Sequence, residues 1–168
     1  MNTSETFKSF IDNLKISNKD DISYKYNRIT KALNKSFYND LDSSTLHSLQ
    51  IGSYGRKTAI DGISDLDMIF EISDADFKKY DSRIHNGQSD LLQDTKKAIQ
   101  KTYSNSDIRG DGQVVVVNFN NYIIEVCPAN LQSDNSYKYP DSNNGGSWKV
   151  TKPRQEISEL NSFNQITM

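Results

Sequence analysis

Two aspartates, Asp65 and Asp67, stand two positions apart at the start of the apolar stretch DLDMIFEI. If this stretch is a strand, residues i and i+2 project from the same face, so both carboxylates point the same way. Like charges held this close repel one another, and burying them is costly unless a cation lies between them. Mg²⁺ prefers oxygen ligands of this kind, together with substrate phosphates. The pair therefore indicates a divalent-cation site, although solvated acids at the entrance of a strand would give the same pattern.

A Gly-Ser pair, Gly52-Ser53, precedes the first of these aspartates by twelve residues. A strand is expected before the pair, and YGRKTAI is expected to begin a helix. The N-terminus of a helix offers free N–H groups and a positive dipole end to phosphate, and glycine lets the backbone approach a ligand closely. The Ser53 hydroxyl and the nearby Arg56 and Lys57 would add to phosphate binding. Gly-Ser alone usually marks a turn, but followed by D-x-D it predicts a phosphate site.

A third acid, Glu125, lies in the middle of the apolar stretch YIIEVCPA. A carboxylate in such a strand needs either a partner or an exposed edge. If this strand neighbours the one that begins near Asp65, Glu125 closes a three-carboxylate cluster of the kind that holds metal ions for phosphoryl transfer. If the strand lies at an edge of the sheet, Glu125 faces water. The single cysteine, Cys127, shares the face of Glu125 by the period of two, and a buried structural thiol is its expected role.

The elements that must position these acids follow from the spacing of apolar residues. Helices are expected over 4–16, 19–39, 74–81, 88–103 and 153–166, and strands over 45–51, 66–72, 113–119, 122–129 and the short SWKV. Asn120-Asn121 is expected to join two of the strands as a hairpin. The polar segment 130–146 is expected to be a loop, and His47 falls inside the first strand. This order favours an α+β or mixed-sheet α/β domain over a parallel βαβ array.

The composition fits one globular domain. The chain has 168 residues, of which 35% are hydrophobic, and its net charge is −2. This is not the strongly basic balance of many nucleic-acid-binding proteins. One cysteine and two distant histidines give poor support to a zinc or thiolate site. Because there is neither a signal-peptide pattern nor a run of about 20 apolar residues, we expect a cytoplasmic protein that does not enter the membrane.

The long helix expected over 19–39 carries basic residues opposite its apolar stripe. They are Lys25, Arg28, Lys31 and Lys35. This row is either a ridge that faces nucleic acid or the solvated face of an amphipathic helix.

GSYGRKTAIDGISDLDMIFEI followed by IIEVCPA resembles the polymerase-beta-like nucleotidyltransferases. Within them it is most similar to the bacterial cGAS/DncV-like nucleotidyltransferases and the oligoadenylate synthases. The resemblance touches most of the chain from about 20 to 166. It implies an α+β fold with a mixed or antiparallel sheet, flanked by helices that include a long N-terminal one.

The resemblance also implies roles for the residues of the three motifs. Asp65, Asp67 and Glu125 would be catalytic and would bind Mg²⁺ or Mn²⁺, with Glu125 also helping to deprotonate the attacking hydroxyl. Gly52 and Ser53 would cradle the β- and γ-phosphates, with Arg56 and Lys57 as nearby cations. Glu125 departs from the family pattern, in which aspartate is the commoner third acid.

The implied reaction is attack of a ribose hydroxyl on the α-phosphate of an NTP, ATP or GTP above all, with release of pyrophosphate. The product would be a cyclic or linear oligonucleotide second messenger in antiphage defence, and a nucleic-acid activator is compatible with the resemblance. Residues 1–168 would be the catalytic domain, nearly inactive by itself, without the C-terminal helical lobe of a longer form. The alternatives are AMP transfer to tRNA, a protein or a small molecule, and a non-catalytic NTP-binding or antitoxin-like interaction module.

Overall fold

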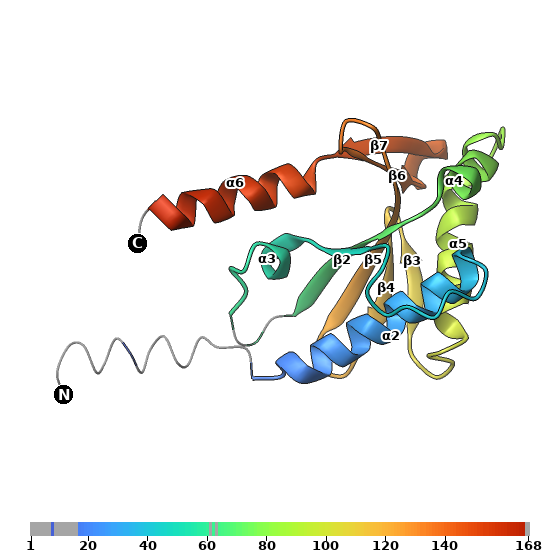
Figure 1. Cartoon of the computed structure of the whole chain (residues 1–168). Helices are drawn as coiled ribbons and strands as arrows, with labels where there is room; N and C mark the ends of the chain where they lie inside the picture. The colour runs from blue at the N-terminus through green and yellow to red at the C-terminus, as the bar shows by residue number, and fades with distance from the viewer. Residues whose placement is uncertain (1–7, 9–16, 61, 63, 167–168) are drawn as a thin grey trace.

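A computed structural model describes residues 8, 17–60, 62 and 64–166 of the chain. Its elements, in chain order, are α2 (Lys19–Phe37), β1 (Ser48–Gln50), α3 (Gly52–Gly55), β2 (Asp65–Glu71), α4 (Asp74–Asp81), α5 (Gly87–Gln100), β3 (Ile108–Asp111), β4 (Val114–Asn118), β5 (Ile123–Leu131), β6 (Tyr137–Asp141), the 3₁₀ turn η1 (Asn143–Gly145), β7 (Ser147–Thr151) and α6 (Pro153–Ile166) (Figure 1). The helix expected over 4–16 lies outside the described residues except at position 8.

One mixed sheet organises the fold. Its main strands follow the order β1-β2-β5-β4-β3, and β6 and β7 extend it from the end of β5. The central pair, β2 and β5, is parallel, whereas the other pairs are antiparallel. Because β5 lies between β2 and β4, Glu125 does not sit on an edge strand. The alternative that placed Glu125 on such an edge is therefore wrong.

The two faces of the sheet differ in what covers them. Met68 and Phe70 of β2 and Val126 of β5 belong to the main core, which they share with α2 and α5. The alternate residues of the same strands face the other way, as the period of two requires. A second, smaller core on that face gathers Ile69, Ala129 and other residues near β6. The side chains of the candidate acids therefore lie on the less covered face of the sheet.

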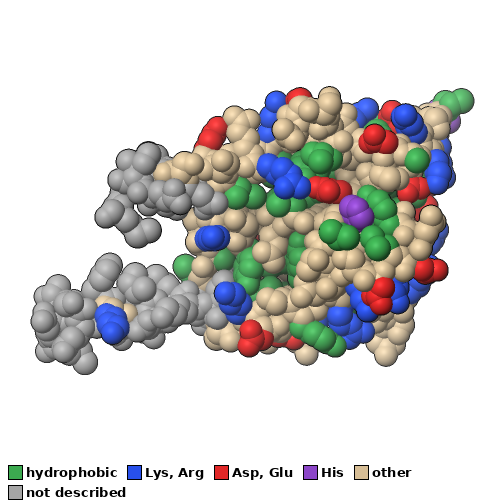
Figure 2. All heavy atoms as spheres, in the orientation of Figure 1, with side chains coloured by type: hydrophobic (Ala, Val, Ile, Leu, Met, Phe, Trp, Pro, Cys, Tyr) green, Lys and Arg blue, Asp and Glu red, His purple; other side chains and the backbone are tan. Residues whose placement is uncertain are grey.

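The helix α2 is confirmed, and its apolar stripe is buried as expected. Its basic row is largely engaged: the Lys25 amine lies 5.0 Å from the centre of the Phe119 ring, and the Arg28 guanidinium carbon lies 5.0 Å from that of Tyr103. Lys31 pairs with Asp42 at 2.6 Å. On the face drawn in Figure 2, basic and acidic side chains are intermixed. These contacts favour the amphipathic-helix interpretation over a nucleic-acid ridge.

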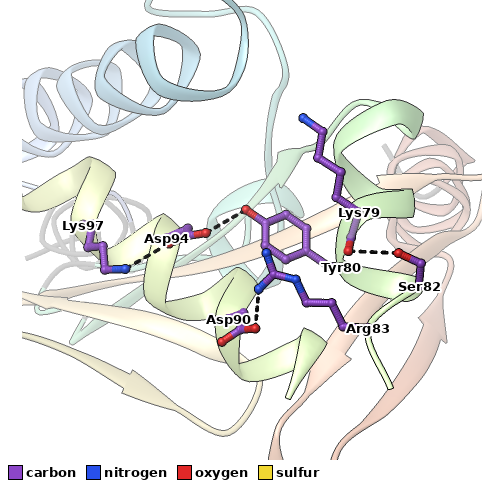
Figure 3. A network of polar contacts seen from close by, with 7 residues as sticks. All are labelled: Lys79, Tyr80, Ser82, Arg83, Asp90, Asp94 and Lys97. Atoms are coloured by element: carbon purple, nitrogen blue, oxygen red, sulfur yellow. Dashed lines mark hydrogen bonds and ion pairs between the residues drawn. The ribbon is translucent and has the colours of Figure 1, made fainter. Parts of the chain in front are cut away.

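The helices α4 and α5 are joined by polar contacts (Figure 3). The Tyr80 hydroxyl of α4 donates a hydrogen bond to Oδ2 of Asp94 in α5 at 3.0 Å, and Lys97 pairs with the same carboxylate at 3.1 Å. Arg83, just after α4, pairs with Asp90. The helices expected over 74–81 and 88–103 are thus both present, and they pack against each other.

The structure corrects several expected elements. The first strand begins only at Ser48, because His47 adopts a left-handed φ of +60° before it. The strand β3 was not expected, and β6 lies inside 130–146, which was expected to be a loop. Pairing with β5 and β7 makes β6 a strand, and Tyr137 is completely buried there. Among the described helices, none combines the length and apolar character needed to cross a membrane.

Candidate active site

The three predicted acids lie on adjacent central strands. Asp65 and Asp67 are the first and third residues of β2, and Glu125 is the third residue of β5. In the parallel ladder Asp67 pairs directly with Glu125, so their side chains lie side by side on one face. Asp65 is exposed, whereas Asp67 and Glu125 are half-buried. The sequence left open whether these two strands are neighbours, and the structure shows that they are.

The three carboxylates interact electrostatically. Burial raises the pKa of Asp67, the charge of Asp65 raises it further, and the charge of Arg56 opposes both. Burial also raises the pKa of Glu125, followed by the charges of Asp67 and Asp65. Each ionised form is therefore disfavoured by its neighbours. Acids whose pKa values are raised by burial and by neighbouring carboxylates, as those of Asp67 and Glu125 are, are typical of functional sites.

The donor chemistry of this group fits a divalent cation. All three side chains offer carboxylate oxygens, the ligands that Mg²⁺ and Mn²⁺ prefer. Neither Asp67 nor Glu125 uses its carboxylate in a hydrogen bond or ion pair with another described residue. With the side-chain positions of the described part of the chain, however, no three acidic, His or Cys side chains converge closely enough to hold a metal ion. The three acids lie on one face of the sheet, but their side chains would have to rotate before their carboxylates could share a cation.

The Gly52-Ser53 turn is tied to the acid strand. The Ile51 N–H donates to the backbone carbonyl of Asp67 at 3.0 Å, which brings Gly52 beside that residue. Gly52 has a φ of +60°, and a β-carbon there would lie 2.0 Å from Oδ2 of Asp67. This position requires glycine for both its conformation and its closeness to the carboxylate.

The helix expected to begin in YGRKTAI is only one turn long. It ends at Gly55, and the N–H groups of Thr58 and Ala59 turn back to the Ser53 carbonyl at 2.9 and 3.2 Å. Lys57, with a φ of +58°, is left-handed and cannot continue the helix. Any phosphate bound here would therefore depend on the backbone N–H groups that a first helical turn leaves free, rather than on a long helix dipole.

The two predicted phosphate-binding cations behave differently. Arg56 lies close enough to Asp67 to lower the pKa of that carboxyl, and its guanidinium donates to Glu156 of α6 at 3.2 Å. Lys57 is exposed, and its amine forms no ion pair with another described residue. The structure thus brings Arg56 to the acids but gives Lys57 no contact with them.

A further polar cluster lies on the same face and was not found from the sequence. Arg154 of α6 donates from Nη2 to Oε1 of Glu71 at 2.6 Å and from Nε to the Tyr137 hydroxyl at 2.7 Å. The Tyr137 hydroxyl also donates to Glu71. The one available signal was that Glu71 continues the i+2 alternation of the aspartates. Nothing in the sequence pointed to Tyr137 or Arg154, which lie far along the chain.

Cys127 lies on the face of Glu125, as predicted. It packs against the small core that contains Ile69, Ala129 and Tyr137. Burial raises the pKa of its thiol to about 12, so the reactive thiolate is scarce at neutral pH.

Comparison with known proteins places the chain among nucleotidyltransferases. The family model for the Second Messenger Oligonucleotide or Dinucleotide Synthetase domain matches residues 1–164. No curated protein sequence matches the chain. A similar solved structure is the Elizabethkingia meningoseptica CdnE cyclic dinucleotide synthase with GTP and Apcpp, at 22% identity and a TM-score of 0.56, over 88% of this chain and 51% of that one.

Two further solved structures share the fold. The Bradyrhizobium diazoefficiens CD-NTase CdnG in complex with GTP has 12% identity and a TM-score of 0.59, over 87% of this chain and 43% of that one. The E. coli MS115-1 CdnC:HORMA-deltaN complex has 17% identity and a TM-score of 0.59, over 94% of this chain and 49% of that one. The chain thus spans about half the length of these structures or less, and it shares the fold of the parts that it covers.

Proposed function

The chain belongs to the Second Messenger Oligonucleotide or Dinucleotide Synthetase family, and from this we propose that it is the catalytic domain of a nucleotidyltransferase. A ribose hydroxyl of one nucleotide would attack the α-phosphate of an NTP. The new bond joins the hydroxyl oxygen to the α-phosphorus, and the bond to the β-phosphate breaks to release pyrophosphate. The product would be a cyclic or linear oligonucleotide second messenger, with a role in antiphage defence.

The observation that carries this proposal is the register pairing of Asp67 with Glu125, with the Gly52 backbone against Asp67. Asp65, Asp67 and Glu125 would hold Mg²⁺ or Mn²⁺, which when bound stabilises the charges of the attacking and leaving oxygens. The free N–H groups of the Gly52-Ser53 turn would bind the phosphates of the NTP.

Glu125 has a second part in the proposal. The attacking hydroxyl must lose a proton, and a carboxylate beside the attacking oxygen, the role proposed for Glu125, can accept it. Arg56 would contribute its charge to the phosphates, because a guanidinium pairs well with phosphate oxygens.

The acceptor must also be held in line with the NTP, and misplacement by about 1 Å can cost on the order of 10²-fold in rate. We propose that a longer form, of about the length of the matched structures, supplies the facing surface for this step. The 168-residue chain is then expected to bind Mg²⁺–NTP weakly and to turn it over slowly.

Calorimetric titration of ATP and GTP in the presence of Mg²⁺, beside a pyrophosphate-release assay on the same sample, tests the proposal. We expect weak binding by this chain, loss of binding in Asp67→Asn, and unchanged binding in the control Asp40→Asn. Asp40 is an exposed acid after α2 with a φ of +61°, a conformation that asparagine also tolerates. No binding at millimolar nucleotide would favour the antitoxin-like interaction module, and robust turnover would show that no second lobe is needed.

The role of Glu125 is tested in an active form of the protein. Glu125→Asp keeps a carboxylate and should retain part of the activity, whereas Glu125→Ala should retain very little. Equal activity of all three forms would remove Glu125 from the site.

A further inference from the structure

The helix α6 touches the end of α3 through Glu156 of its first turn and through the following residue, Ile157. Arg56 Nη1 donates to Glu156 Oε1 at 3.2 Å, across a hundred positions of sequence. One residue further on, the Ile157 side chain lies 3.4 Å from where a β-carbon on Gly55 would be. Gly55 and Ile157 also line a pocket of about 420 Å³. The contact therefore lies beside open space and is not backed by packed core.

Arg56 lies in the field of two carboxylates. On one side is Asp67, whose pKa it lowers, and on the other is Glu156, its ion-pair partner. Only one guanidinium nitrogen bonds Glu156, and the Glu156 side chain is 59% exposed. Such a single-bonded, exposed ion pair contributes little stability, about 1 kcal/mol or less.

We propose that Glu156 sets the nucleotide affinity of the site by holding the Arg56 guanidinium that a nucleotide phosphate would otherwise bind. This inference rests on the function proposed above. Guanidinium recognises carboxylate and phosphate with the same planar set of donors, so Glu156 and a nucleotide phosphate compete for Arg56. A phosphate of an NTP carries more charge and more acceptor oxygens than Glu156, so it displaces Glu156 when it binds.

The start of α6 is also held by Arg154, whose contacts take no part in this exchange. Arg154 bonds both Glu71 and the Tyr137 hydroxyl, at 2.6 and 2.7 Å, and Tyr137 is completely buried. These bonds do not involve Arg56. Nucleotide binding therefore releases Glu156 from α3 and leaves α6 anchored at Arg154. Figure 1 shows α6 running from β7 past α3, the two elements that this contact joins.

The test is a calorimetric titration of Mg²⁺–ATP into the full chain and its variants. Glu156→Gln frees Arg56 and should tighten binding by roughly 2- to 5-fold, the fold-change that corresponds to a surface ion pair. The control is Glu159→Gln, which removes the same charge from the same helix at a residue that, among the described residues, bonds Gln155. It should leave the affinity unchanged. In an Arg56→Gln background, Glu156→Gln should have no effect.

Hydrogen exchange of the backbone amides at 155–158 gives a second readout. Saturation with Mg²⁺–ATP should speed exchange there in the wild-type chain, and Glu156→Gln should show the faster exchange without nucleotide. Unchanged exchange on nucleotide binding would overturn the inference, as would equal affinities of the wild type and Glu156→Gln. An equal gain in affinity for Mg²⁺–ATP in Glu156→Gln and Glu159→Gln would show a general effect of the charge of α6, and it would also overturn the inference. Absence of binding in every variant would overturn the proposed function as well.

Discussion

Oδ2 of Asp67 lies only 2.0 Å from the point where a β-carbon would project from Gly52. The Asp67 carboxylate therefore packs directly against the Gly52 backbone, in the space that a side chain at Gly52 would fill. The hydrogen bond from the Ile51 N–H to the Asp67 carbonyl, at 3.0 Å, holds the two segments in this position. Two motifs that stand apart in the sequence thus form one continuous surface.

Gly52→Ala, compared with a second glycine variant, should distinguish the cost of backbone strain from an effect on nucleotide binding. Alanine at φ +60° costs about 1–2 kcal/mol of stability, and the new β-carbon forces the Asp67 carboxylate to rotate away. The matched control is Gly62→Ala, at φ +79°, where no described residue beyond the chain neighbours comes within 4 Å of the added carbon. Urea unfolding should show a similar loss of stability in both variants. Only Gly52→Ala should lose affinity for Mg²⁺–ATP, and equal affinities would contradict a role for the contact.

Asp67→Asn should stabilise the fold while it abolishes turnover in an active form of the protein. Burial and the charge of Asp65 raise the pKa of Asp67, so the folded state binds this proton more tightly than the unfolded state does. Ionised Asp67 therefore lowers the free energy of unfolding. This loss of stability is absent at low pH, appears above the ordinary aspartate pKa of about 3.9, and is complete above the raised pKa of Asp67. Asparagine removes it.

The melting temperature of Asp67→Asn should accordingly exceed that of the wild type at pH 7. The difference should close as the pH falls toward the ordinary pKa of aspartate. A melting temperature below the wild-type value at pH 7 would show that the Asp67 carboxylate is paired favourably in the folded state.

Lys57→Gly should stabilise the chain by roughly 0.5–1 kcal/mol, because glycine adopts a left-handed φ of +58° without strain. Lys57→Ala removes the same charge but keeps the strain, so it serves as the control and should give no gain. Guanidinium chloride unfolding of the three forms measures this difference. Their affinities for Mg²⁺–ATP report separately on the predicted phosphate contact: a loss shared by both variants would support it.

Cys127 should react slowly with a thiol reagent in the native chain and rapidly after unfolding. Its thiol has a pKa raised to about 12 by burial, so little thiolate is present at neutral pH. Because it is the only cysteine, the labelling rate reports on this position alone. Rapid labelling that Mg²⁺–ATP blocks would place Cys127 in the nucleotide site instead.

The sequence by itself determined the central strands, the long helix and the three acids. Alternation around Asp65 and Asp67 and the apolar residues around Glu125 are local patterns with strong periods, and local patterns need no knowledge of distant segments. The strand β6 was missed because its few residues become a strand only by pairing with β5 and β7. The short helix α3 was expected to be longer because nothing local revealed the left-handed Lys57.

Only the tertiary structure decided which distant groups meet. The parallel pairing of β2 with β5 is what sets Asp67 against Glu125, and a sequence holds no direct record of which strands become neighbours. The same applies to α6, which brings Glu156 to Arg56 and Arg154 to Glu71. Such contacts depend on how whole elements pack to bury their apolar faces. The physical reason is that burial is non-directional, so the sequence marks which residues are buried but not against which partners.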